Sequence, residues 1–420
     1  MGGADLPVSR WRTGAEPSRR LTARKEKFSR SIAARARLPA ILQHAQANVV
    51  LACVSSKLHL CFSYLGDPET LQRLSNSSLP GAWPAGMAGG AGPALSAAVD
   101  RLARLDERLA AAPPAVRRGW LAHMLLEEAA ASAALDAIAV DADELRLQAV
   151  GALAADEERT VEGVDRVALA AGLLRLLRAV TARHPRQLFT ANRLAAAARL
   201  RLKGRPGEIA AGLLQERLPP SLIEVPDPAA ARAALARALT PEAMASWHDL
   251  PPLIAAGGFL GHWSASGGAD AVGGAVGRAL VPQLLVRLGA TAGPVLFPAL
   301  GFRGHLGRYR PDRLLTEDGA LIAWLEACRR AAEVGLALHG RLSTAHQRLH
   351  QALKPARATG RGGLVADLLT ETPAVTGAIL AQRSGLSAAA TRLLLSRAVA
   401  AGALHLLTRR DAFRVYGPLL

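Results

Sequence analysis

The chain has 420 residues and a formal net charge of +17, and its length is enough for about two to three domains. Ala, Leu and Arg dominate and aromatic residues make up 4% of the chain, a composition that favours helix. The basic excess is typical of proteins that bind a polyanion such as nucleic acid, although a basic tail without a partner is the alternative. The sequence contains no apolar run long enough to span a membrane. Cys53, Cys61 and Cys328 form no disulfide or metal framework, so we expect a cytoplasmic protein without metal or cofactor.

Residues 1–93 differ from the rest of the chain in composition. The first forty residues carry ten basic side chains and three acidic ones, and Pro80–Pro93 (PGAWPAGMAGGAGP) has the composition of a flexible linker. A basic, acid-poor start also resembles an organelle transit peptide. We expect residues 1–93 to be a disordered basic extension and linker, or the product of a start codon assigned too far upstream.

From Ala94 onward, apolar residues recur at intervals of three and four, which predicts a series of helices and a mainly α fold. The prolines and glycines between the periodic stretches place loops, the longest of them over Gly204–Pro228. Within residues 94–350 the pattern predicts helices over 95–109, Trp120–Ala134, Val164–Arg183, Gln187–Leu202, Ala229–Leu239, Pro241–Ser246, Asp249–Trp263, Gly274–Leu288 and Asp318–Leu342. Gly301–Arg313 (GFRGHLGRYRPDR) is predicted to be a solvated, basic connector.

A basic hinge over residues 351–363 leads to a terminal domain, residues 364–420, with the pattern of a winged helix-turn-helix. Ser387 is a natural N-cap and Gly402 a natural stop for the second helix of the motif. The predicted elements are helices over Leu364–Thr370, Val375–Arg383 and Ala388–Ala401 and strands over Ala403–Leu407 and Ala412–Tyr416. The predicted core consists of Leu368, Leu369, Ile379, Leu380, Leu386, Leu393, Leu394, Val399 and Leu404.

This arrangement of elements can lay one helix in the major groove of DNA. Nine basic residues and three acidic ones lie between Leu353 and the last residue, a local excess that suits contact with phosphates. Winged helices also dock proteins, which is the alternative interpretation. The residues predicted to contact DNA are Ser387, Thr391, Arg392, Ser396, Arg397, Arg409, Arg410 and Arg414.

Two segments of the helical region resemble motifs of the Fic family. Trp263–Leu280 (WSASGGADAVGGAVGRAL) resembles the signature His-Pro-Phe-x-Asp/Glu-Gly-Asn-Gly-Arg-x-x-Arg, with its second arginine at Arg278 and part of its glycine turn at Gly274. Glu127–Ile138 (EEAAASAALDAI) resembles the family's inhibitory helix, Ser/Thr-x-x-x-Glu-Gly/Asn, with Ser132 and Asp136 on the serine and glutamate positions. Taken without the resemblance, the first segment is a close helix-packing stretch and the second an ordinary alanine-rich helix.

The order of these parts, with a helix-turn-helix at the end, also resembles that family. Ala97–Ile138 (AAVDRLARLDERLAAAPP…EEAAASAALDAI) is similar to a rhizobial-type plasmid family of helical proteins with a C-terminal helix-turn-helix. The resemblance implies a Fic-like helical domain over residues 94–350. It also implies a relict cleft containing Ser132, Asp136, Gly274 and Arg278, in which Asp136 and Arg278 can form an ion pair.

The resemblance does not extend to the catalytic residues of the family. Gly267, Ala271 and Ala275 stand where the family has its catalytic histidine, its Mg²⁺-binding acid and its first arginine. We therefore expect a DNA-binding protein, a transcriptional regulator, whose degenerate helical domain forms a homodimer, binds a protein partner or senses a ligand. Two alternatives stay open: an active Fic-type nucleotidyltransferase (AMPylator) that uses His262 or Asp270, and an antitoxin-like interaction module.

Overall fold

The computed structural model describes residues 87–152, 160–161, 164–189, 233, 236–240, 242, 245, 247–248, 250–354, 360–408 and 414–420. The expectations for residues 1–86, for the loop over Gly204–Pro228 and for most of the helix over Gln187–Leu202 lie outside these residues. None of the helices in the described ranges has both the length and the apolar character needed to cross a membrane.

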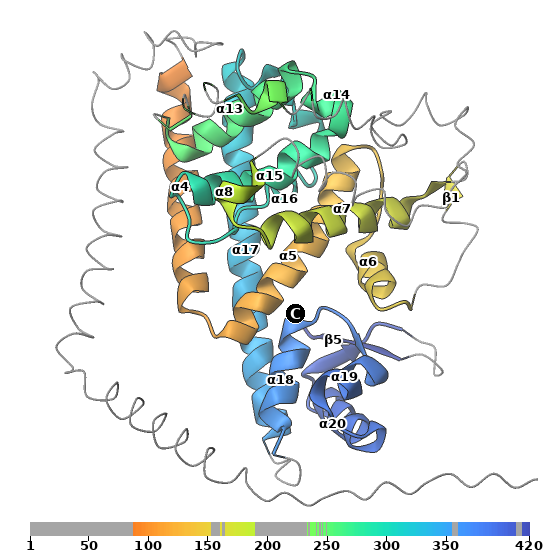
Figure 1. The fold of residues 1–420 in the computed structure, drawn as a ribbon. Helices are drawn as coiled ribbons and strands as arrows, with labels where there is room; N and C mark the ends of the chain where they lie inside the picture. Colours follow the sequence, from red (N-terminus) through yellow and green to blue (C-terminus); the bar gives the residue numbers. More distant parts are fainter. Residues whose placement is uncertain are drawn as a thin grey trace, which may run out of the picture. The chain divides into compact units, whose positions relative to one another are not determined.

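The fold is mainly α (Figure 1). Two long helices, α4 (Met87–Ala111) and α17 (Asp318–Leu353), pack side by side, and α5 (Pro114–Leu135) packs against α17 and against α7 (Arg166–Thr181). α13 (Pro252–Ala265) and α15 (Gly274–Arg287) pack on each other, and α15 also contacts α7. The smaller elements are α6 (Ala142–Ala149), the antiparallel pair β1 (Thr160–Val161) and β2 (Val164–Asp165), α8 (Pro185–Leu188), α14 (Gly268–Val272), α16 (Pro298–Gly301), η2 (Leu306–Arg308) and η3 (Pro311–Arg313).

Several helix boundaries differ from the predicted ones. α5 begins at Pro114 rather than Trp120, and α7 begins at Arg166 because Val164 and Asp165 form β2. Two further boundaries differ most. α4 begins at Met87, inside the segment predicted to be linker, and Ala91 and Leu95 are buried, so burial of one face outweighs the poor helix propensity of the glycines and of Pro93. α17 continues beyond the predicted end at Leu342, because its buried stripe continues through Leu349 and Leu353.

α6 was not predicted at all. It starts at a capping box in which the side chain of Asp141 accepts from the Asp143 N–H and the side chain of Glu144 accepts from the Asp141 N–H. The sequence shows this box directly, as Asp followed three positions later by Glu.

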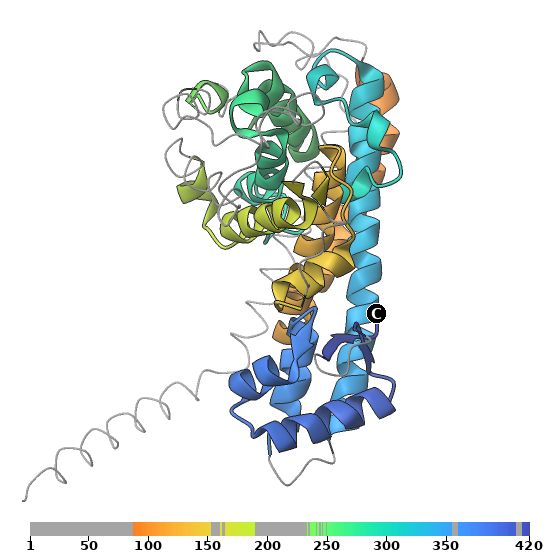
Figure 2. The ribbon, with the colours of Figure 1, turned by 90° about the vertical axis from the view of Figure 1, so that its right-hand side faces the viewer.

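The last part of the chain contains α18 (Gly362–Glu371), β3 (Val375–Thr376), α19 (Gly377–Ser384), α20 (Ala388–Ala400), β4 (Leu404–Leu406) and β5 (Val415–Pro418). The strands form an antiparallel sheet in the order β3-β5-β4, in which Tyr416 of β5 pairs with Val375 on one side and with Leu406 on the other. Figures 1 and 2 show the C-terminal elements in blue, with β5 labelled in Figure 1. β3 was predicted to be the start of a helix. Thr376 instead ends the strand and caps α19 by accepting from the Ile379 N–H at 3.2 Å.

These C-terminal elements share one hydrophobic cluster, the terminal core. Four of the predicted core residues are buried in it, and Leu368, Ile379, Leu386 and Val399 pack against it. Leu393 was predicted to belong to this core, but its exposed fraction is 54%, so that prediction is wrong. Leu349 and Leu353 of α17 also lie in the terminal core, although the sequence placed a hinge at residues 351–363. The members of the terminal core are Leu349, Leu353, Val365, Ala366, Leu369, Val375, Leu380, Leu394, Leu395, Ala398, Ala403 and Leu404.

Candidate functional site

Local signals fix the start of α20. Gly385 follows α19 with a φ of 65°, in the left-handed region that glycine adopts without strain. The Ser387 hydroxyl then accepts from the Ala390 N–H at 3.2 Å and starts α20. Leu394, Leu395 and Ala398 bury the inner face of the helix in the terminal core. The opposite face of α20 is thereby presented to solvent.

The exposed face of α20 carries most of the residues predicted to contact DNA. Arg392, Ser396 and Arg397 are exposed, and Leu393 lies between them on the same face. α20 contains no acidic residue, so nothing on the helix itself offsets the charge of its two arginines. Such a face can approach a polyanion.

Thr391 does not belong to this face. Its side chain is fully buried, and its hydroxyl has no hydrogen-bond partner among the described residues. Positions 391, 394, 395 and 398 follow the period of 3.6 residues and line the inner side of α20. The prediction that Thr391 contacts DNA is therefore wrong.

The remaining predicted DNA contacts are distributed around α20 and β5. Ser387 is exposed but caps the helix, and Arg414 is exposed immediately before β5. Arg409 and Arg410 lie outside the described residues.

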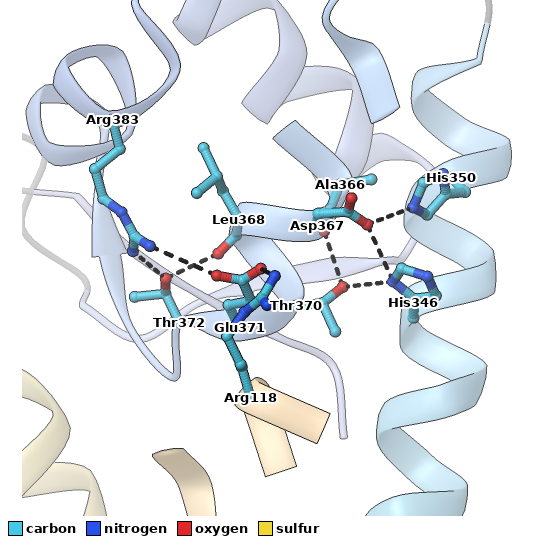
Figure 3. A network of polar contacts seen from close by, with 10 residues as sticks. All are labelled: Arg118, His346, His350, Ala366, Asp367, Leu368, Thr370, Glu371, Thr372 and Arg383. Carbon is cyan, nitrogen blue, oxygen red and sulfur yellow. Dashed lines mark hydrogen bonds and ion pairs between the residues drawn. The ribbon is translucent and has the colours of Figure 1, made fainter. Parts of the chain in front are cut away.

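Two acids of the terminal region, Glu371 and Asp367, lie within the described residues, and both are engaged by basic side chains (Figure 3). The Glu371 carboxylate binds Arg118 of α5 at 2.6 Å and lies 3.8 Å from Arg383, and Asp367 contacts His350. Neither acid lies on α20.

The second predicted cluster, around Arg278, is buried. Arg278 lies on α15 with an exposed fraction of 2%, and it donates from Nε to the Ser132 hydroxyl and from Nη2 to the Ser132 carbonyl, both at 2.9 Å. The same Nη2 lies 2.9 Å from Asp136 Oδ1. Thus the ion pair that the sequence allowed between Asp136 and Arg278 is present. Gly274 leaves room for it, because a Cβ there would lie 3.2 Å from Arg278 Nη1.

Tyr309 completes this environment and was not predicted. It comes from the segment expected to be a solvated connector, and its ring lies 5.4 Å from Arg278 Cζ. Burial by itself lowers the pKa of Arg278, but Asp136 and Tyr309 together outweigh burial and raise it. Arg278 is therefore a permanently charged group whose donors are occupied by protein atoms.

Glu128 is a further buried acid that sequence reasoning missed. Its carboxylate accepts from the N–H groups of Ala299 and Leu300, at 3.1 and 3.0 Å, at the start of α16. Burial raises the pKa of Glu128 to about 8, and the two backbone donors and Arg278 oppose this rise. The signal was present in the sequence, because Glu128 and Ser132 of α5 and Asp136 at its C-cap are spaced by four.

Glu128 predicts a pH dependence of stability. Its folded pKa of about 8 exceeds the ordinary value of 4.5, so the folded state keeps a proton that the unfolded chain releases, and stability falls as pH rises through this window. Buried His123 has the opposite effect on stability below pH 6.5, since burial lowers its pKa to about 3 and stability there rises with pH.

We expect urea midpoints to decrease between pH 6.5 and 8. Glu128→Gln should flatten that slope, because the glutamine side chain does not titrate. A matched variant, Glu326→Gln, should keep the slope; an equal slope in Glu128→Gln would contradict the assignment.

The glycine-rich segment packs helices together. A Cβ on Gly268 would lie 2.9 Å from the Trp263 ring, and one on Gly277 would lie 2.8 Å from it, so both glycines let the indole lie between α14 and α15. Gly267, at the expected histidine position, has a φ of 77°, and Ala275 is buried. Asp270 and His262, the side chains that an active transferase would use instead, differ in exposure: Asp270 is exposed, whereas His262 is half-buried beside Trp247.

The sequence predicted no metal site, but the structure brings together a set of possible ligands. His346, His350 and Asp367 offer donor atoms that all lie within 4.8 Å of one another. The spacing of the two histidines, four apart on α17, was the signal in the sequence.

Comparisons with known proteins leave the chain without a family. No family model matches it, and no curated protein matches it. Among solved structures it is similar to a Fic family protein from Desulfovibrio desulfuricans G20, with 18% identity, a TM-score of 0.38, and coverage of 78% of this chain and 96% of that one. So distant a likeness says nothing about the activity of this chain.

Proposed function

We propose that the chain is a DNA-binding protein, a transcriptional regulator, that contacts DNA through the exposed face of α20. The observation that carries this proposal is a helix with two exposed arginines and no acid, which follows a tight turn and precedes a hairpin. The order helix, strand, helix, turn, helix and two strands supports a winged helix-turn-helix. In this arrangement α20 lies in the major groove.

Each side chain of the interface has a defined role in the proposal. Arg392 and Arg397 meet base edges or phosphates from α20, and Ser396 lies between them on the same face. Arg414, with Arg409 and Arg410 of the segment between β4 and β5, contacts the DNA backbone beside the groove. These arginines give the interface its salt dependence.

We propose that the helical region acts as a catalytically degenerate Fic-like domain that forms a homodimer, binds a partner or senses a ligand. Three observations support the loss of transfer chemistry. Arg278 is occupied by Ser132 and Asp136, the glycine-rich segment packs on Trp263, and Gly267 offers no base. Ser132 and Asp136 occupy the Nε and Nη2 groups of Arg278, which a bound phosphate would otherwise use.

The proposal predicts distinct effects for the arginines of α20. We expect Arg392→Ala and Arg397→Ala to weaken binding to duplexes selected from a random pool, by about 1–3 kcal/mol where the side chain reads a base. Where it contacts a phosphate, the slope of log K against log salt should fall by about 1. Arg409→Ala should weaken binding to all duplexes alike. Fluorescence anisotropy across a salt series measures both quantities.

The control for charge alone is Arg104→Ala, an exposed arginine of α4. This variant removes the same charge from the helical region and should bind DNA as the unmodified chain does. Binding that is undetectable, or insensitive to salt, would remove the proposal. Equal losses in Arg104→Ala and Arg397→Ala would show that net charge rather than the α20 face is responsible.

A further inference from the structure

A cluster of metal-ligating side chains lies where α17 meets α18 (Figure 3). His346 and His350 are four residues apart on α17, so their rings share one face of the helix, with centroids 4.4 Å apart. Asp367 projects from α18 toward both rings. Its Oδ1 lies 2.9 Å from His350 Nε2 and 3.9 Å from His346 Nδ1. We propose that these three side chains bind a divalent transition-metal ion, with Zn²⁺ as the best match.

The separations of the donor atoms suit a tetrahedral ion. Zn²⁺ binds histidine nitrogen at about 2.0–2.1 Å and carboxylate oxygen at about 2.0–2.2 Å, which places neighbouring donors about 3.3 Å apart. The two separations from Asp367 Oδ1, 2.9 and 3.9 Å, lie on either side of that value. All three donor atoms lie within 4.8 Å of one another, so we infer that rotations of the side chains bring them to the distances that the ion requires.

The donor set selects the class of metal. Two imidazoles and one carboxylate suit Zn²⁺ and similar transition metals, whereas Mg²⁺ and Ca²⁺ prefer oxygen ligands alone. Two histidines four apart on a helix are a spacing that holds zinc in proteins. The side chains of His350 and Asp367 are 40% and 42% exposed, so an ion can enter from solvent and keep a water as its fourth ligand.

The hydrogen bonds around the cluster show what the ion would replace. The Thr370 hydroxyl donates to the Ala366 carbonyl at 2.8 Å, so it accepts from His346 Nδ1 at 3.1 Å. His350 Nε2 donates to Asp367 in the same way. On metal binding, each ring changes tautomer. The nitrogen that donates a hydrogen bond in the metal-free chain coordinates the ion, and the hydrogen moves to the other ring nitrogen. The rings therefore stay neutral and release no net proton. Burial and His350 lower the pKa of His346, and Asp367 opposes this effect. The lowered pKa favours the neutral ring.

Arg118 of α5 does not compete with an ion for Asp367. The charge of Arg118 couples to Asp367, but its guanidinium is held by Glu371 at 2.6 Å. A bound ion would join α17 to α18 directly beside the terminal core, since Leu349, Val365 and Ala366 belong to that core. The expected consequence is added stability of the terminal region in the presence of metal.

The test uses the untagged full chain stripped of metal with a chelator. We expect calorimetric titration with Zn²⁺ to show that the unmodified chain binds one equivalent of the ion. Asp367→Asn and His350→Gln should each bind that ion about a hundredfold or more weakly. This loss of affinity exceeds the range for residues that only support a ligand. Titration with Co²⁺ should give the strong visible absorption of a four-coordinate ion in the unmodified chain and lose it in both variants. Circular dichroism establishes that each variant is folded.

The matched control is His339→Gln, which replaces a histidine of α17 outside the cluster. This variant should bind one equivalent of Zn²⁺ as the unmodified chain does. Metal bound by Cys53, Cys61 or any other group outside the described residues would appear equally in every variant and cancels in the difference. Equal Zn²⁺ affinity in the unmodified chain and in both ligand variants overturns the proposal, as does a Co²⁺ spectrum that the variants leave unchanged. A Zn²⁺-dependent rise in the thermal midpoint, present in the unmodified chain and absent in Asp367→Asn, is a second expected result.

Discussion

Replacing Asp136 with alanine should lower the free energy of unfolding by about 3–5 kcal/mol, the range for a buried ion pair that loses one partner. Arg278 would keep its contacts with Ser132, but its charge would stay in a site where its side chain is 2% exposed. Urea unfolding followed by circular dichroism measures the change.

Two further variants isolate the cause of that loss. Asp136→Ala combined with Arg278→Met should recover most of the stability, because the unpaired charge is removed and the volume is kept. Asp100→Ala breaks an exposed pair with Arg104, at 3.0 Å, and should cost no more than about 0.5 kcal/mol. If Asp136→Ala unfolds no more easily than Asp100→Ala, the Arg278 cluster is not the buried charge site described here.

Gly119→Ala should separate α18 from α5. A Cβ at Gly119 would lie 2.2 Å from the Thr370 carbonyl oxygen and 3.1 Å from Leu342, so backbone as well as side chain would have to move. Overpacking of this kind typically costs about 1–3 kcal/mol, and a clash with backbone lies at the upper end of that range. We expect a lower urea midpoint. We also expect the 2.6 Å contact between Arg118 and Glu371 to be lost, because it spans the same two helices.

Gly340→Ala is the control for the helix propensity of alanine. Gly340 lies inside α17, and a Cβ there would meet nothing within 4 Å. The replacement should stabilise the chain by about 0.5–1 kcal/mol. A similar gain in Gly119→Ala would show that α18 does not rest on α5 at this position.

The helices with the clearest apolar period were predictable from the sequence, whereas their ends depended on contacts between distant residues. Leu95, Leu102, Leu105 and Leu109 of α4 are buried as the period predicts. The end of α17 was missed because its last turns are buried by α18 and α20, which follow it in the chain. α4 begins earlier than predicted for a similar reason, since composition alone makes its first turns look like linker.

The candidate sites divide in the same way. Ser132, Asp136 and Arg278 were named from a sequence pattern and do meet, but Tyr309 reaches them from a segment whose composition indicated only a solvated loop. Thr391 is polar but occupies an inner position of α20, so the polarity of its side chain is a poor guide to its exposure. His346 and His350 could be read from their spacing, but Asp367, on another helix, could be paired with them only in three dimensions.

The continuity of α17 bears on how such a chain can be divided by recombination. Its buried residues include Trp324 and Cys328 in the helical region as well as Leu349 and Leu353 in the terminal core. A segment starting at residue 360 would carry α18, α19 and α20 without the two leucines that fill their centre. We therefore expect that the terminal region cannot be moved to another protein by itself. A functional gene fusion would need its junction inside α17, upstream of Leu349.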